Sequence, residues 1–178
     1  MRHPWLAVAV ALLPGAAWAQ VATPVAELFG GYSYSRSDGQ SLHGWESSLA
    51  LNLSGWLGVA ADVSGHYGSV TGGDFSRLAF LAGPRLSRRR GDLTLFVHAL
   101  AGGVRTSTGV TVLGVSITAS HTDAGGALGG GFDFKLRPHW ALRIQGDVLA
   151  TRAEGETSTG PRLAAGVVYR AGARSASR

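Results

Sequence analysis

The feature that most constrains this chain is a two-residue alternation that recurs in short segments along most of its length. In each segment, apolar side chains alternate with Arg, Asp, Glu, Ser and Gly, and breaks rich in Gly, Ser, Asp or Arg separate the segments. Successive side chains of a strand point to opposite faces, so a period of two indicates strands rather than helices. Segments of about ten residues with one apolar and one polar face are typical of a barrel that crosses a membrane, with lipid outside and a polar lumen inside.

The N-terminus has the order of residues found in a secretory signal peptide. Arg2 gives a basic start, an apolar run extends from Trp5 to Leu13, and Ala17-Trp18-Ala19 supplies small residues around a cleavage site. The apolar run is shorter than the ~20 residues that a transmembrane helix needs, which argues against the alternative of an uncleaved anchor. No later stretch approaches a transmembrane helix, because polar residues interrupt every apolar run.

We therefore predict one domain behind a cleavable signal peptide. The predicted division of the chain is a signal peptide at 1–19, a short lead at 20–25, an outer-membrane β-barrel at 26–170 and a polar tail at 171–178.

Composition excludes several classes of protein. The chain has no cysteine, which rules out disulfides, a thiol nucleophile, cysteine-bound metal and lipid attachment at an N-terminal cysteine. Its 27 glycines are about twice the usual share and point to tight turns and close-packed strands. The net charge is +5, but the basic residues are scattered singly except for Arg88-Arg89-Arg90, which we place in a turn. With no basic face or motif for nucleic acid, the excess charge suits an anionic lipid surface better.

The alternation yields eight strands, and the tight connections make them antiparallel. The predicted strands are 28–36, 43–53, 56–67, 75–86, a fifth from 93, a sixth ending at 136, 139–151 and 162–170. The connections after the second, fourth and sixth strands are short, whereas the other connections are longer and more polar. Short periplasmic turns and longer external loops are typical of outer-membrane barrels. The predicted fold is thus an all-β, eight-stranded antiparallel up-and-down transmembrane β-barrel with both termini in the periplasm.

Charged side chains recur on the polar face, which would point into the lumen. The predicted lumen charge network consists of Glu46, Asp62, Arg77, Arg85, Asp133, Lys135, Arg143 and Asp147. An eight-stranded barrel is only wide enough for side chains to fill it, and an unpaired buried ion costs several kcal/mol. We therefore favour a salt-bridged plug, with a selective pore or proton path as the alternative.

Aromatic residues gather at the two ends of the apolar face, as in the interfacial belts of membrane proteins. The predicted membrane-interface residues are Trp56, Phe134, Trp140 and Tyr169 at the short-turn end, and Tyr34, Trp45 and Tyr67 at the loop end. The alternative is a soluble barrel that binds an apolar ligand. That alternative inverts the faces and predicts that Leu49, Val59 and Leu142 point into a cavity.

The fifth connection is unusual, because valine and isoleucine alternate with Thr and Ser between Thr106 and Thr122. We interpret it as strands that continue beyond the membrane into a protruding hairpin. An exposed hairpin edge could pair with another protein chain. The alternative is a loop whose apolar residues fold back onto the barrel rim.

Evidence for catalysis is weak. His66-Tyr67-Gly68-Ser69, with Asp62 and Asp74 nearby, is the best local candidate for a nucleophilic site, and His121-Thr122-Asp123 is the second. Neither has a spacing that specifies a triad, and triads are recognised by geometry. No cluster has metal-ligand spacing and no Gly-rich segment opens a helix, so we expect no metal and no cofactor.

Several short motifs, taken in order, resemble the small outer-membrane β-barrel proteins of Gram-negative bacteria. They are Gly30-Gly31-Tyr32-Ser33-Tyr34, Gly83-Pro84-Arg85, Phe96-Val97-His98-Ala99, Gly129-Gly130-Gly131-Phe132-Asp133 and Trp140-Ala141-Leu142-Arg143. The resemblance, to the porin-like or opacity-type family and to the OmpA transmembrane domain and OmpX, covers about 26–170. The family usually ends on an aromatic residue, whereas here Tyr169 is followed by Arg170 and a polar tail.

The resemblance implies partners and roles. The expected partners are outer-membrane lipid, lipopolysaccharide and the barrel-assembly machinery. The expected function is non-enzymatic, in envelope structure or adhesion through the external loops. A narrow porin-like channel and a lipid-modifying enzyme are the alternatives within the membrane.

Overall fold

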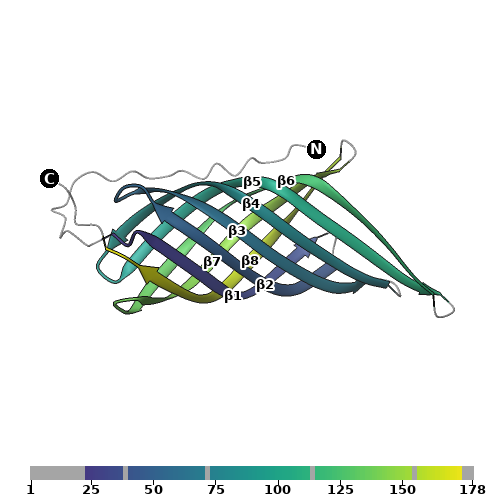
Figure 1. Ribbon diagram of the computed structural model, residues 1–178, viewed down its shortest axis with the longest axis horizontal. Helices are drawn as coiled ribbons and strands as arrows, with labels where there is room; N and C mark the ends of the chain where they lie inside the picture. Colours follow the sequence, from purple (N-terminus) through teal and green to yellow (C-terminus); the bar gives the residue numbers. More distant parts are fainter. Residues whose placement is uncertain (1–22, 38–39, 71–72, 113–114, 154–155, 174–178) are drawn as a thin grey trace, which may run out of the picture.

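Eight strands account for nearly all of the described chain in the structure, which is a computed structural model. It describes residues 23–37, 40–70, 73–112, 115–153 and 156–173. The strands are β1 (Ala26–Ser37), β2 (Gln40–Asn52), β3 (Leu57–Val70), β4 (Gly73–Arg90), β5 (Leu93–Val112), β6 (Val115–Arg137), β7 (Trp140–Ala153) and β8 (Glu156–Ala171). Each strand pairs antiparallel with the next, and β8 pairs with β1 to close the barrel (Figure 1). The predicted fold class is confirmed.

The barrel has two distinct ends, shown at the left and right of Figure 1. At one end, which we call the terminal end, β1 begins and β8 ends, and the turns 53–56, 91–92 and 138–139 lie there. The remaining strand-to-strand connections lie at the other end, which we call the hairpin end. The backbone of Val25 donates to Ala171 O, and Asn52 N donates to Val25 O, both at 3.0 Å, so residues before β1 are tied to the terminal end.

The apolar face of each strand points outward. Leu49, Val59 and Leu142 are 44%, 43% and 47% exposed, whereas their polar-face neighbours Ser48 and Arg143 are buried. The soluble-barrel alternative is therefore wrong, because it required these three apolar side chains to line a cavity. Since strand residues alternate sides, this orientation carries the polar faces of the strands into the interior.

The connections at the hairpin end are shorter than the sequence predicted. They comprise only residues 38–39, 71–72, 113–114 and 154–155. Apart from the β5–β6 hairpin, where strands were expected to continue, the strands extend into segments that we expected to be polar loops. Polar Ser, Thr and Gly residues still pair in a ladder once the strands have left the apolar band, so polarity was a poor guide to where the strands end. The prediction of long loops after the first, third and seventh strands was wrong, and the strands protrude there as well.

The basic run Arg88-Arg89-Arg90 is also placed differently from the prediction. It belongs to β4, and the turn consists of Gly91 and Asp92, with Gly91 at φ 57°. That left-handed conformation suits glycine, since other residues adopt it at a cost. The strand continues through the run because Arg88 and Arg90 are exposed while Arg89 points inward, so the alternation is preserved.

The hairpin formed by β5 and β6 projects farthest from the barrel (Figure 1). The two strands stay paired up to Val112 and Val115, whereas β7 reaches only the Ala124–Arg152 pair. The segment 115–123 of β6 therefore has one side without a strand partner among the described residues. The predicted hairpin is confirmed, and a loop folded onto the rim is wrong.

The structure does not describe the two ends of the chain. The predicted signal peptide, 1–19, and most of the predicted polar tail lie outside the described residues. Within the described ranges, no helix is long and apolar enough to cross a membrane.

Candidate functional site: the barrel interior

One arginine organises the interior on the hairpin side of the barrel. Arg162 of β8 contacts Asp62 of β3 and Asp147 of β7, each at 2.8 Å between guanidinium nitrogen and carboxylate oxygen, and Glu46 of β2 at 3.4 Å. It also donates to Ser64 Oγ at 2.8 Å. All five residues are buried. We call this group the Arg162 cluster; it ties four strands together through one side chain.

Further polar groups satisfy the carboxylates of the Arg162 cluster. His98 Nε2 lies 2.5 Å from Asp147 Oδ1, and Gln145 donates to Glu46. Ser33 donates to Glu46 at 3.4 Å and shares a 2.9 Å hydrogen bond with His66 Nε2. Buried carboxylates need such partners, because an unsatisfied charged group in the interior is strongly destabilising.

A second charged group, the Glu27 cluster, fills the interior near the terminal end. Glu27 contacts Arg85 and Arg89 at 2.9 Å and Arg143 at 3.4 Å. Asp133 accepts two hydrogen bonds from Arg143, at 2.7 and 2.9 Å, in the bidentate geometry that gives strong pairs. Asp133 also lies 3.6 Å from Arg85 and 3.5 Å from Arg170.

Two phenylalanine rings pack among the guanidinium groups of the Glu27 cluster. Arg85 lies 4.1 Å from the centroid of Phe96, and Arg143 lies 4.5 Å from Phe96 and 5.1 Å from Phe29. Cation–π contact of this kind is favourable when the cation has lost water. The phenylalanine rings therefore lie between arginines of the Glu27 cluster, in which the arginines outnumber the carboxylates.

Little free space remains between the two clusters. The cavity there has a volume of about 10 Å³, near the minimum that holds one water molecule. Its wall includes Asp62, Arg85, Phe96, His98 and Arg143. Apolar side chains fill another part of the interior, namely Ala50, Ala60, Ala79, Leu81, Leu100, Val104, Ala127 and Leu149.

The structure places most of the predicted charge network in these clusters. Glu46, Asp62, Arg85, Asp133, Arg143 and Asp147 are all buried and all in ion pairs. Arg77 is half-buried toward the hairpin end, 5.6 Å from the ring of Phe75.

The prediction for Lys135 was wrong: its side chain is exposed and lines the opening at the terminal end. It follows the inward alternation of β6, but the register with β7 shifts between Lys135 and Arg137, beside the turn. A side chain at the last inward position of a strand faces the mouth rather than the packed interior.

The sequence prediction omitted several members of the clusters. Glu27, Arg162 and Arg170 lie at alternating positions of the first and last strands, so the two-residue period could have included them. Arg89 was missed because its run was placed in a turn. The contacts of the buried residues His66 and His98 are with strands distant in sequence, so no local pattern indicated them.

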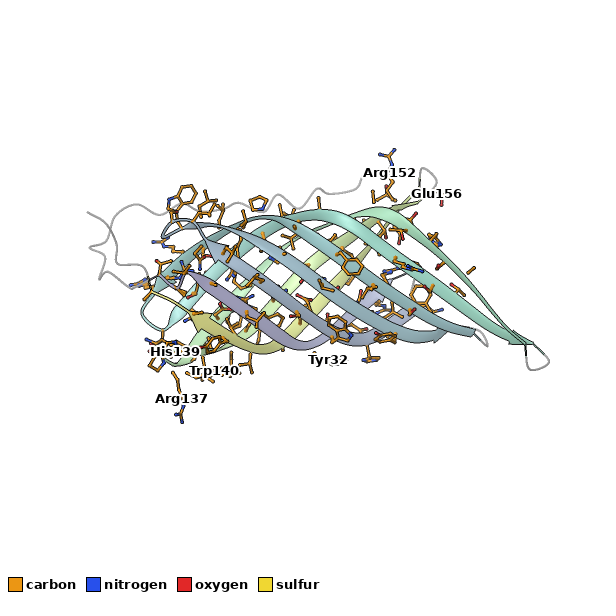
Figure 2. All side chains as sticks on the ribbon, viewed as in Figure 1. Tyr32, Arg137, His139, Trp140, Arg152 and Glu156 are labelled. Carbon is orange, nitrogen blue, oxygen red and sulfur yellow. The ribbon has the colours of Figure 1, made fainter. Side chains whose placement is uncertain are left out.

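The predicted interfacial aromatic residues mostly point away from the barrel. Trp56, Phe134, Trp140 and Tyr169 are exposed at the terminal end, where Figure 2 labels Trp140. Trp140 packs edge-on against Tyr169 with centroids 5.0 Å apart. Toward the hairpin end, Trp45 and Tyr67 are exposed, whereas Tyr34 is half-buried and its hydroxyl bonds Ser41 at 2.9 Å. Their contact with a membrane interface stays a prediction.

The candidate catalytic groups do not assemble into a triad among the described side chains. His66 is 1% exposed and shares a hydrogen bond with Ser33, which also donates to the carboxylate of Glu46. Asp62 contacts Arg162 and not His66. The side chains of Ser69 and Asp74 lie outside the described residues. His121 Nε2 lies 3.0 Å from Asp123 Oδ2 in an exposed pair. No described group of three or more His, Cys, Asp or Glu residues could hold a metal ion.

Several solved structures with the same architecture are bacterial outer-membrane barrels. Neisserial surface protein A is 14% identical with a TM-score of 0.61, covering 82% of this chain and 95% of its own. Ail, the attachment invasion locus protein of Yersinia pestis, is 19% identical with a TM-score of 0.57, covering 81% and 97%. The chain has the fold of the small outer-membrane β-barrels. OprG from Pseudomonas aeruginosa, 13% identical with a TM-score of 0.54, covers 83% of this chain and 96% of its own. No protein-family model and no curated protein matches the sequence.

Proposed function

We propose that this protein is a non-enzymatic barrel of the bacterial outer membrane, with a closed lumen and an adhesive or envelope-stabilising role carried by its projecting hairpins. The observation that carries the proposal is the combination of an apolar outer surface with an interior filled by paired charges. A soluble protein would bury the first, and an open channel would hydrate the second.

The height of the uncharged outer band supports a membrane location. On β5, the outward positions from Leu93 to Gly103 carry no charge, and Arg105 is the next outward residue. Ten steps of about 3.3 Å, tilted by about 40°, rise about 25 Å, which is the height of the lipid-facing band of outer-membrane barrels. Exposed arginines at both ends, such as Arg88 and Arg152, then lie where lipid phosphates begin.

The same arginines suggest how the barrel meets its lipid partners. Arg36, Arg105 and Arg152 are exposed on outward positions at the hairpin end. If that end faces outward from the cell, they lie at the level of the lipopolysaccharide phosphates, which guanidinium groups bind well. Tyr169 is exposed near the end of β8 and is the aromatic residue that the barrel-assembly machinery would recognise.

The closed lumen is tested by conductance. The purified barrel in planar bilayers should give no reproducible current steps, because two ion-paired clusters occupy the described interior and the cavity between them has a volume of only about 10 Å³. A porin reconstituted in the same bilayers controls for detection. Reproducible single-channel steps from the barrel would overturn the plug and favour the narrow channel.

Adhesion rests on the projecting hairpin and its unpaired edge. Within the part of the chain that the structure describes, the backbone of 115–123 lacks a strand partner on its β7 side, and an extended segment of another protein can add to such an edge. The attachment role in the name of Ail, a barrel of the same fold, is consistent with this role. The free edge makes the hairpin 106–122 the proposed protein-binding element.

The adhesion test shortens the hairpin and removes, from the rest of the barrel, only the pairing of 108–110 with 73–75 of β4. Excising 108–119 and joining Ser107 to Ser120, which are paired, through Asn-Gly shortens the hairpin in register. Cells displaying this variant should lose attachment to cultured host cells while the barrel folds normally. A control that joins Gly68 to Phe75, also paired, shortens a different hairpin and should attach normally. Equal attachment by both variants would contradict the proposal.

Orientation and the absence of enzymatic activity have their own tests. With both termini in the periplasm, an epitope inserted at 113–114 should be labelled on intact cells, whereas one after the last residue should not be.

Lipid A from cells with and without the protein should have the same mass spectrum. A changed acyl pattern that His66→Ala abolishes would make the protein a lipid-modifying enzyme instead.

A further inference from the structure

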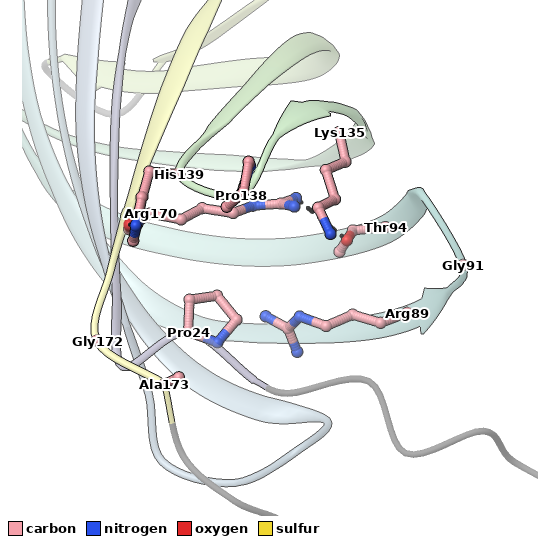
Figure 3. A pocket seen from close by; sticks show the side chains of 10 residues that line it. All are labelled: Pro24, Arg89, Gly91, Thr94, Lys135, Pro138, His139, Arg170, Gly172 and Ala173. Atoms are coloured by element: carbon pink, nitrogen blue, oxygen red, sulfur yellow. Dashed lines mark hydrogen bonds between the residues drawn. The ribbon is translucent and has the colours of Figure 1, made fainter.

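The opening at the terminal end of the barrel is a cavity of about 270 Å³ whose charged lining residues are all basic (Figure 3). Its polar and cationic lining residues are Arg89, Thr94, Lys135, His139 and Arg170, contributed by β4, β5, β6, the β6–β7 turn and β8. No Asp or Glu is among the described residues that line it. We propose that this opening, the terminal mouth, binds a phosphate group.

The charges beneath the terminal mouth do not balance. Glu27 and Asp133 contribute two negative charges to the Glu27 cluster, whereas Arg85, Arg89, Arg143 and Arg170 contribute four positive charges. Lys135 adds a fifth positive charge at the rim. Buried excess charge is costly unless a counter-charge is present. An anion of charge −2 would balance the four arginines and two carboxylates of the Glu27 cluster.

The two arginines nearest the opening have unused donors. The Arg89 and Arg170 side chains are 6% and 10% exposed, yet the Nε of each has no hydrogen-bond partner among the described residues. Arg170 reaches Asp133 only at 3.5 Å and Thr94 Oγ1 at 3.2 Å. Figure 3 shows both guanidinium groups extending across the cavity from opposite walls. A buried N–H group without a partner calls for an explanation, and a ligand bound in the adjoining cavity supplies one.

The donor set favours phosphate over other anions. Guanidinium groups match phosphate oxygens geometrically, and a lysine ammonium and a hydroxyl add donors from other directions. The Nδ1 atom of His139 is held 3.0 Å from the backbone oxygen of Arg170, which fixes the ring at the cavity wall. A space of 270 Å³ admits a phosphate together with the group it is esterified to. Two sources share this chemistry: a phospholipid headgroup of the adjacent leaflet and a soluble phosphate compound.

The test follows the two unpaired N–H groups directly. The ¹⁵N-labelled protein is folded in a phosphate-free, uncharged detergent, and inorganic phosphate is added against a chloride control of equal ionic strength. The Nε–Hε signals of Arg89 and Arg170 should shift saturably with phosphate but not with chloride. Arg89→Gln or Lys135→Gln should weaken binding about tenfold or more, since each removes a charged donor.

A matched variant and a lipid arm complete the test. Arg137 lies at the same end but points away from the barrel in Figure 2, so Arg137→Gln should leave the affinity unchanged. In nanodiscs of phosphatidylglycerol, signals that are already shifted and no longer respond to phosphate identify the lipid headgroup; a normal response identifies a soluble compound. The proposal is overturned if the shifts do not saturate, or if Lys135→Gln and Arg89→Gln both bind phosphate as the unmodified protein does.

Discussion

Replacing Arg162 by methionine is the most direct test of how the interior is held together. Methionine has a similar length but no donor, so Arg162→Met leaves Asp62, Asp147 and Glu46 without their shared cation. Removing one partner of a buried ion pair costs about 3–5 kcal/mol. Because this side chain serves three carboxylates at no measurable exposure, we expect a loss near the upper end, about 5 kcal/mol in the free energy of unfolding.

The assay is equilibrium urea unfolding in lipid vesicles, followed by tryptophan fluorescence and by the migration of unboiled samples on a gel. Arg137→Met, at an exposed position at the end of β6, is the matched control and should stay within about 0.5 kcal/mol of the unmodified protein. Adding Asp62→Asn to Arg162→Met removes one of the carboxylate charges that have lost Arg162. The double variant should therefore recover about 1–3 kcal/mol.

A small effect would refute the reasoning. If Arg162→Met costs less than about 1 kcal/mol, then water already solvates the three carboxylates and the interior is not sealed. The same result would favour the channel over the plug, so the unfolding and conductance measurements check one another.

Three further predictions follow from single contacts. Ile144→Arg places a charge in the middle of the outer band and should cost about 2–4 kcal/mol in vesicles, measured by the same urea titration; no cost would mean that Ile144 does not face lipid. Gly129→Ala should cost about 1–3 kcal/mol because its Cβ would overlap the backbone at Gly146 O and Asp147 Cα, whereas Gly103→Ala, with no atom closer than 3.6 Å, should not; equal unfolding midpoints would contradict this close packing. Gly91→Ala should lose about 1–2 kcal/mol to its left-handed backbone, and an unchanged midpoint would indicate another turn conformation.

Strand ends were the weakest part of the sequence prediction, for a physical reason. Within the membrane band, the apolar outer face makes the alternation obvious, as in 139–151, which corresponds closely to β7. Beyond the band both faces become polar, as in 156–161 of β8, and the alternation no longer distinguishes a strand from a loop. Arg88-Arg89-Arg90 shows the same ambiguity at the other end, where three consecutive charges conceal a strand whose middle residue points inward.

The sequence by itself determined that the chain forms eight antiparallel strands, which face of each is apolar, and that charges such as Asp62 and Arg143 lie inside. A side-chain period of two carries that information locally. Only the tertiary structure decided that Arg162 meets carboxylates from β2, β3 and β7, and that Lys135 lies at a mouth instead of in the network. Those outcomes depend on strand register and on closure of the barrel, which bring together residues about a hundred positions apart and leave no trace in local sequence.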